Sequence, residues 1–140
     1  IDLGIAMQLT NISRDVIEDS KNNRFYINEN FKEILSTINL ADTFYENSFY
    51  SIKDIPISLR FSILVARRVY KKIGYKIQSK KNFENYQNSG KIYVSSVEKV
   101  LETFLSIFDL IKLSFSYKLD HEIQHDHNLI NEEIKLDERI

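Results

Sequence analysis

The chain has 140 residues, of which 43% are hydrophobic and 28% charged, and its formal net charge is −1. This composition suits one globular domain with one core, and the near balance of charge gives no electrostatic case for nucleic-acid binding. The lack of cysteine excludes disulfides, thiolate metal sites and cysteine nucleophiles. Three glycines and one proline in the whole chain suit an all-α protein with few tight turns. No apolar run reaches the roughly 18 residues expected of a membrane span.

The first predicted helix covers residues 2–20 and carries a row of polar side chains. Their spacing of three, four and four residues places them within a narrow arc of one helix face. The row consists of Gln8, Asn11, Asp15 and Asp19. An apolar strip runs beside it, formed by Ile5, Leu9, Ile12 and Val16. Because no charge occurs between Leu3 and Ser13, we expect the first three turns to be buried nearly all round.

The polar row is expected to line a cavity, because an unsatisfied buried polar group costs about 1–3 kcal/mol. Mg²⁺ is usually held by one or two carboxylates together with substrate phosphates. Asn11, Asp15 and Asp19 offer three oxygens about one helical turn apart and are therefore candidate ligands. From spacing alone, a solvated acidic helix end explains Asp15, Glu18 and Asp19 equally well.

Two helices are predicted between a loop at residues 24–27 and residue 54. Asn28 can cap a short helix that ends near Asn39. Its apolar positions have helical spacing and are Phe31, Ile34, Leu35 and Ile38. The next helix would begin at Leu40 and stop near Lys53.

The clearest helical pattern covers residues 56–79, after a cap and first-turn signal at residues 54–56. Its apolar residues recur every four positions at Phe61, Val65, Val69, Ile73 and Ile77. Residues 79–94 have loop composition.

Ser95 and Glu98 form a capping box that starts the last predicted helix. We expect its inward face to consist of Val97, Leu101, Phe104, Leu105, Phe108 and Ile111. Beyond residue 117 the sequence is polar, and we interpret residues 118–140 as a flexible tail. His121, His125 and His127 are interpreted as part of this tail and not as metal ligands.

The stretch LGIAMQLTNISRDVIED at residues 3–19, followed by NRFYI at residues 23–27, closely resembles the second aspartate-rich motif of the squalene/phytoene synthase family. Within that family it looks most like the bacterial phytoene synthases. The resemblance covers residues 1–117 and implies an all-α, isoprenoid-synthase-type helix bundle. The chain opens inside the helix of this motif, so we expect it to be the C-terminal half of a longer enzyme. The first aspartate-rich motif would then lie upstream, and the isolated fragment would be inactive.

The resemblance implies roles for individual side chains. Asn11, Asp15 and Asp19 would bind Mg²⁺, with Mn²⁺ as an alternative, and Asp15 and Asp19 would be the catalytic carboxylates. The prenyl diphosphate substrates would be contacted by Gln8, Arg14, Arg24, Tyr26 and Tyr70. Glu18 matches the motif but lies off the main arc, so we expect it to contact the metal-binding side chains and not the metal itself. Lys91 stands where the family usually has arginine, and we do not expect it to be essential.

The implied reaction is the head-to-head condensation of two geranylgeranyl diphosphates to phytoene with release of diphosphate, a step of carotenoid biosynthesis. Three alternatives stay open: the same chemistry on farnesyl diphosphate to give squalene or dehydrosqualene, a non-catalytic relative that acts in assembly, and a plain helical interaction module. The presence of Asn11, Asp15 and Asp19 favours an enzyme. Because substrate and product are very apolar, we expect a cytoplasmic protein with peripheral membrane contact. Leu105–Phe115 is a candidate for that contact, although core packing is the main expectation for it.

Overall fold

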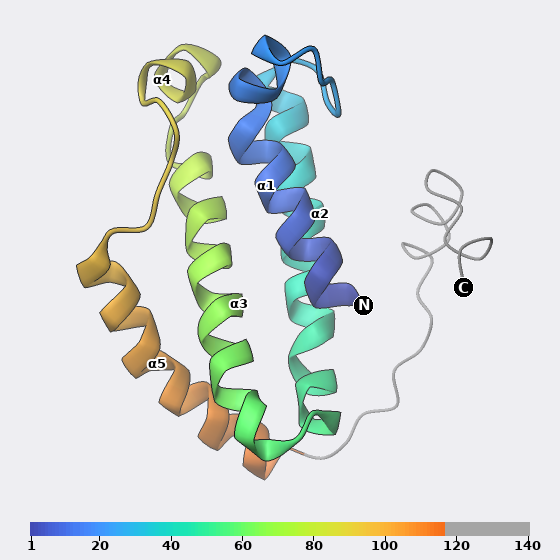
Figure 1. Cartoon of the computed structure of the whole chain (residues 1–140), viewed down its shortest axis with the longest axis vertical. Coiled ribbons are helices and arrows are strands. Elements are labelled where there is room, and N and C mark those ends of the chain that lie inside the picture. Colours follow the sequence, from blue (N-terminus) through green and yellow to red (C-terminus); the bar gives the residue numbers. More distant parts are fainter. Residues whose placement is uncertain (117–140) are drawn as a thin grey trace, which may run out of the picture.

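The computed structural model describes residues 1–116, and every regular element within them is a helix. The elements are α1 (Asp2–Lys21), α2 (Phe31–Ser51), the short 3-10 helix η1 (Ile52–Asp54), α3 (Ile57–Gln78), α4 (Phe83–Asn88) and α5 (Ser96–Phe115). Figure 1 shows α1, α2 and α3 as long neighbouring rods, with α4 at one end and α5 along the outer side of α3. The predicted all-α bundle is confirmed. The predicted tail at residues 118–140, with its three histidines, lies outside the described residues.

The core lies between α1, α2 and α3 and continues down to the last turns of α5. One cluster contains Ala6 of α1 and the residues Ala41, Phe44 and Tyr45 of α2. A second cluster joins Val16 to Ile34, Ile38, Ile73 and Ile77. A third joins the ends of α2, α3 and α5 through Phe49, Leu64 and Leu113, together with Ile52. Each such side chain contributes about 1.5–3 kcal/mol on burial, so these clusters fix the side of α1 that faces the protein.

The expectation that the first three turns of α1 are buried nearly all round is wrong. The buried side is narrow and consists of Asp2, Ala6, Thr10, Ser13 and Val16. Gly4 and Gln8 are exposed, and most of the predicted apolar strip is only half-buried. The reason is that α1 packs against α2 and α3 along one side only. The polar row therefore lies at an open surface of the described chain.

The expected break at Asn39 is also wrong, because α2 is continuous from Phe31 to Ser51. An interior asparagine costs a helix less than about 0.7 kcal/mol, and the buried residues Ile38 and Ala41 on either side of it hold the helix together. The cap of α2 is Asn30, whose side chain accepts a hydrogen bond from the backbone N–H of Lys32, and not Asn28.

The predicted loop at residues 79–94 contains the short helix α4. Its cap is Asn82, whose side chain accepts a hydrogen bond from the backbone N–H of Asn85. The predicted bounds of α1 and α3 agree with the structure to within one residue at each end. The capping box of Ser95 and Glu98 at the start of α5 is confirmed.

The predicted inward face of α5 is wrong. Val97, Leu101, Phe104, Phe108 and Ile111 are between 49% and 79% exposed, and Leu105 is half-buried. The predicted core packing of Leu105–Phe115 likewise fails for Phe115, which is 85% exposed. The side of α5 that meets α3 is polar, because Arg68 of α3 donates to the carboxylates of Glu102 at 2.9 Å and Asp109 at 2.8 Å. These charge-assisted bonds set the rotation of α5 and turn its apolar side outward. No helix within residues 1–116 is long and apolar enough to cross a membrane.

Candidate functional site

The polar row of α1 lines an open pocket of about 300 Å³. Arg24 and Tyr26 of the loop that follows α1 also belong to its lining. The lining side chains are Gln8, Asn11, Ile12, Arg14, Asp15, Glu18, Asp19, Arg24 and Tyr26. Of the predicted site residues, only Tyr70 is missing from this lining. We refer to this hollow as the α1 pocket.

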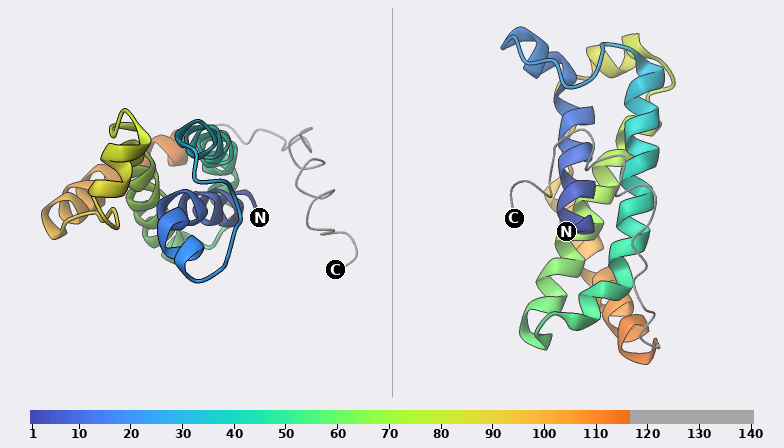
Figure 2. Two further views of the ribbon diagram at one scale, coloured as in Figure 1. Left: turned by 90° about the horizontal axis from the view of Figure 1, so that it is seen from above. Right: turned by 90° about the vertical axis from the view of Figure 1, so that its right-hand side faces the viewer.

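The loop reaches the pocket because the chain reverses directly after α1. Asn23 adopts a left-handed backbone conformation with φ of 56°, which asparagine tolerates better than most residues. The backbone N–H of Arg24 then donates to the carbonyl oxygen of Asp19 at 2.8 Å. This reversal brings the guanidinium of Arg24 to 3.3 Å from the Asp19 carboxylate. Figure 2 shows the loop projecting from the end of α1.

Asp15 is held by two cations. Arg14 donates to both of its carboxylate oxygens, at 2.8 and 2.7 Å, and the Lys91 ammonium lies 3.4 Å away. Burial by itself would raise the pKa of Asp15, but the hydrogen bonds and charge of Arg14, together with Lys91, outweigh it and lower the pKa below its usual value. Asp15 is therefore ionised at neutral pH and suited to bind cations.

Asn11 carries the most informative polar atom of the pocket. Its side-chain oxygen Oδ1 is buried and has no hydrogen-bond partner within residues 1–116. A buried acceptor without a partner costs about 1–3 kcal/mol, so this oxygen gains most from a cation or a donor arriving in the pocket. The orphaned amide oxygen and the carboxylates of Asp15 and Asp19 fit a hard divalent cation such as Mg²⁺.

The residues of the α1 pocket nevertheless supply only some of the ligands that a divalent cation takes. Across residues 1–116, no three histidine, cysteine, aspartate or glutamate side chains converge in a way that could hold a metal ion. The pocket offers an amide and the two aspartates of the motif, so a divalent cation bound here would need further ligands from outside these residues. Substrate phosphates are the usual source of such ligands for Mg²⁺.

Lys91 is closer to the motif than the sequence indicated. It lies just before α5, yet its ammonium donates to the Glu18 carboxylate at 2.6 Å. Bonding to Glu18 raises the pKa of Lys91 above its usual value. Glu18 therefore ties the connection between α4 and α5 to α1. The only signal in the sequence was the resemblance of residues 91–95 to a family segment that carries arginine.

Tyr86 of α4 was missed by the sequence analysis. It is 3% exposed, and its hydroxyl lies within hydrogen-bond distance of the carbonyl oxygens of Ser13 at 2.8 Å and Arg14 at 2.9 Å. Desolvation by burial raises the pKa of Tyr86 to about 12. The bond joins α4 to α1 at the turn that carries Arg14 and Asp15. Nothing in the local pattern of residues 79–94 could have shown this contact.

Tyr70 is half-buried and packs against both the cluster that contains Ala6 and the cluster that contains Val16. It is not part of the lining of the α1 pocket. The pKa of Arg14 in the pocket is raised mainly by its hydrogen bond to Asp15.

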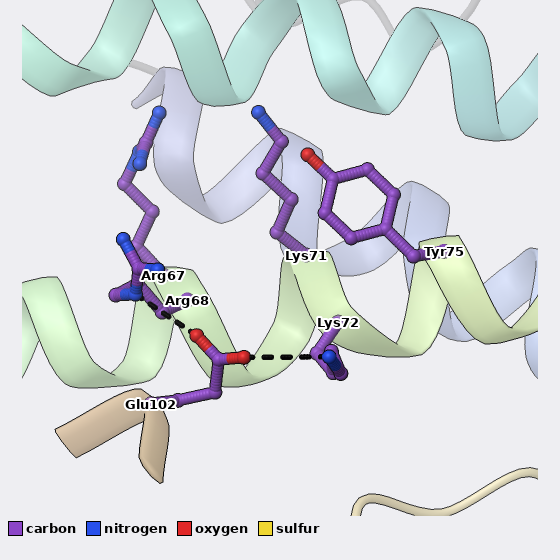
Figure 3. A pocket seen from close by; sticks show the side chains of 6 residues that line it. All are labelled: Arg67, Arg68, Lys71, Lys72, Tyr75 and Glu102. Atoms are coloured by element: carbon purple, nitrogen blue, oxygen red, sulfur yellow. Dashed lines mark hydrogen bonds and ion pairs between the residues drawn. The ribbon is translucent and has the colours of Figure 1, made fainter. Parts of the chain in front are cut away.

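A second pocket, of about 320 Å³, lies beside α3 and is rich in cations (Figure 3). Its lining consists of Arg67, Arg68, Lys71, Lys72, Tyr75 and Glu102. Each cation already has an acidic partner: Glu46 binds Arg67 and Lys71, and Glu102 binds Arg68 and Lys72. We therefore interpret this cluster as an ion-pair network that joins α2, α3 and α5.

Comparison with known proteins shows similarity to carotenoid enzymes over part of the chain. A 15-cis-phytoene synthase of a Paracoccus species is 33% identical over 95 residues, which covers 55% of this chain and 31% of that protein. A 15-cis-phytoene synthase of Enterobacter agglomerans is 32% identical over 97 residues, covering 54% and 33%. A phytoene synthase of Pseudescherichia vulneris is 31% identical over 99 residues, covering 56% and 32%.

The chain thus spans about a third of the length of the curated relatives it matches. No protein-family model matches the chain. No solved structure matches it either. The resemblance found in the sequence is confirmed, as a relationship to part of the phytoene synthases.

Proposed function

We propose that this chain, a partial relative of the bacterial phytoene synthases, forms part of a transferase that condenses two geranylgeranyl diphosphates head-to-head to phytoene. The observation that carries the proposal is the α1 pocket, where acceptor oxygens and two arginines meet on one surface. Such a pocket suits a diphosphate better than an uncharged ligand, because it combines fixed cations with oxygens that can share a metal with phosphate.

The chemistry requires this combination. Condensation begins when the carbon–oxygen bond to the diphosphate breaks, which leaves an allylic carbocation and a multiply charged leaving group. Arg14 and Arg24 would compensate that charge. Their ion pairs with Asp15 and Asp19 support the proposal, because these contacts hold the four side chains together. Mg²⁺ bound by Asn11, Asp15 and Asp19 would neutralise further negative charge on the diphosphate. Gln8 and Tyr26 would contact the substrate beside these charges.

Several parts of the proposal concern the protein as a whole. We expect the 140-residue chain alone to be inactive, because its pocket is open and its metal ligands are incomplete. The apolar substrate and product support a cytoplasmic protein that works at a membrane surface as a peripheral protein.

The test is a chimera in which residues 1–116 replace the matched third of the Paracoccus relative. The chimera is given radiolabelled geranylgeranyl or farnesyl diphosphate with Mg²⁺, and the extracted products are separated by chain length. We expect a forty-carbon product from geranylgeranyl diphosphate. Asp15→Asn and Asp19→Asn should each lower its formation by at least roughly 100-fold. Glu29→Gln removes an exposed acid outside the pocket and should leave the rate unchanged.

The other outcomes discriminate between the alternatives. A thirty-carbon product from farnesyl diphosphate would keep the chemistry and change the substrate to that of squalene or dehydrosqualene synthases. A folded chimera without any product would overturn the proposal in favour of a non-catalytic relative.

A further inference from the structure

α5 carries an apolar strip that nothing else in residues 1–116 covers, and we call it the α5 strip. It consists of Val97, Leu101, Phe104, Phe108, Ile111 and Phe115, which are between 49% and 85% exposed. The opposite side of α5 contains the buried residues Glu102, Ser106 and Leu113. Glu102 pairs there with Arg68 of α3. The strip therefore points away from α3, and Figure 2 shows α5 on the outer side of that helix.

The α5 strip has the size of a protein interface. Its six side chains together expose on the order of 700 Å² of apolar surface. The largest apolar patch of a typical monomer covers roughly 300–600 Å², whereas each partner of a standard stable complex buries about 800 Å². More than half of the large exposed apolar side chains of residues 1–116 lie on α5. The strip is thus the main apolar surface with which this part of the chain can bind another protein segment.

The spacing within the α5 strip indicates that its partner is a helix. Its residues follow each other at alternating steps of four and three. This period of 3.5 is that of a seam between two helices, where side chains of one helix fill the gaps of the other. A bilayer requires no such period, and helices that lie in a membrane surface carry a polar face rich in lysine and arginine. The polar face of α5 instead presents Glu102 and Asp109 to α3.

The α1 pocket and the extent of the chain indicate where this helix belongs. The curated relatives match the chain over only 31–33% of their length, so about two thirds of such a protein lies outside the match. A divalent cation in the α1 pocket would need ligands from that remaining part. The connection that brings Lys91 to Glu18 leads directly into α5, and the strip begins six residues after Lys91. A part that completes the pocket must be held on residues 1–116, and the α5 strip offers the surface to hold it.

We propose that the α5 strip binds a helix from the remaining part of the same longer protein. α5 is then an inner helix, which pairs with α3 through its charged side and with the remaining part through its apolar side. The contact fixes that part relative to the connection that carries Lys91, and thereby relative to the α1 pocket. The inference rests on one element of the proposed function, namely that this chain is one part of a longer protein.

The test is the accessibility of cysteines placed in the strip, because the chain has no cysteine of its own. Phe104→Cys and Phe108→Cys are each made in the 140-residue chain and in the chimera that carries residues 1–116 within the Paracoccus relative. Maleimide labelling is followed at roughly 1 μM protein, at which weakly associated copies separate. The chimera without an added cysteine gives the background.

We expect fast labelling in the 140-residue chain and labelling that is at least roughly 100-fold slower in the chimera. Ser36→Cys is the control, because this residue of α2 is exposed and the change replaces only one atom. It should label equally fast in both proteins. The chimera lacks residues 117–140, so protection there cannot come from them.

Thermal unfolding gives a second measurement, which does not depend on labelling. The double variant Phe104→Ser, Phe108→Ser changes two side chains that are exposed within residues 1–116. It should therefore shift the Tm of the 140-residue chain by less than roughly 2 °C. In the chimera the same double variant should lower the Tm by at least roughly 5 °C, because it removes two large side chains from an interface.

The outcomes separate this inference from the proposed function. A chimera that makes the forty-carbon product while both strip cysteines label as fast as Ser36→Cys would overturn the inference and leave the function standing. A chimera that protects both cysteines but makes no product would support the inference and overturn the function. Slow labelling of the 140-residue chain by itself would show that a second copy or residues 117–140 cover the strip, against the inference. Protection of that chain by phosphatidylglycerol vesicles, without protection in the chimera, would identify a bilayer as the partner instead.

Discussion

Tyr86 offers the sharpest test of how the α1 pocket is held in place. It belongs to α4, a helix of six residues that is too short to be stable by itself. Its hydroxyl donates the hydrogen bond that ties α4 to α1, with the carbonyl oxygens of Ser13 and Arg14 within reach. Tyr86→Phe removes that donor and keeps the ring in the core, so it isolates the contribution of the hydrogen bond.

The expected cost follows from the geometry. The hydroxyl has one proton to donate, and a buried hydrogen bond contributes about 1 kcal/mol net. For a domain of this size, that loss lowers Tm by roughly 4 °C. Tyr86→Ala removes the ring as well and should cost about 3–5 kcal/mol through the cavity it leaves. Urea unfolding followed by circular dichroism measures both free energies. Tyr93→Phe, at a tyrosine that is 64% exposed, is the control.

The same residue predicts a response to alkaline pH. Because burial raises the pKa of Tyr86 to about 12, the unfolded chain loses this proton before the folded protein does. The free energy of unfolding should therefore fall as the pH rises from the usual tyrosine value of 10 to 12, and less steeply in Tyr86→Phe. A Tyr86→Phe variant with the stability and pH profile of the wild-type chain would refute the view that this hydroxyl holds α4 on α1.

Three further predictions concern α5 and its contacts. Arg68→Met leaves Glu102 and Asp109 without their main partner and should lower the free energy of unfolding by about 2–3 kcal/mol. This is less than the cost of breaking a fully buried pair, because Lys72 stays 3.6 Å from Glu102. A loss below about 0.5 kcal/mol in urea unfolding, the value of an exposed pair, would contradict the network. Ser95→Ala removes the cap of α5 and should cost about 1 kcal/mol, with faster amide exchange in the first turn as the direct sign. The hydrogen bond from Lys76, with those from Ser95, lowers the pKa of Glu98 from 4.5 to about 2. Stability from this group is thus present above pH 4.5 and lost as the pH falls to 2, and an equally steep acid transition in Glu98→Gln would argue against it.

The sequence alone predicted most of the α1 pocket. A helix repeats every 3.6 residues, so the spacing of Gln8, Asn11, Asp15 and Asp19 was enough to place them on one face. A loop was predicted at residues 24–27, and the structure brings its Arg24 and Tyr26 to the same pocket. These are local relationships, and the chain specifies them over a few residues.

The tertiary structure decided which side of each helix is covered. Periodicity shows that a helix has an apolar side, but it does not show what lies against that side. In α5 the ion pairs of Arg68 with Glu102 and Asp109 compete with apolar packing and set the rotation of the helix. Lys91 and Tyr86 reach α1 from more than 70 residues away along the chain. Such contacts depend on how distant elements meet in space, so the local sequence pattern does not predict them.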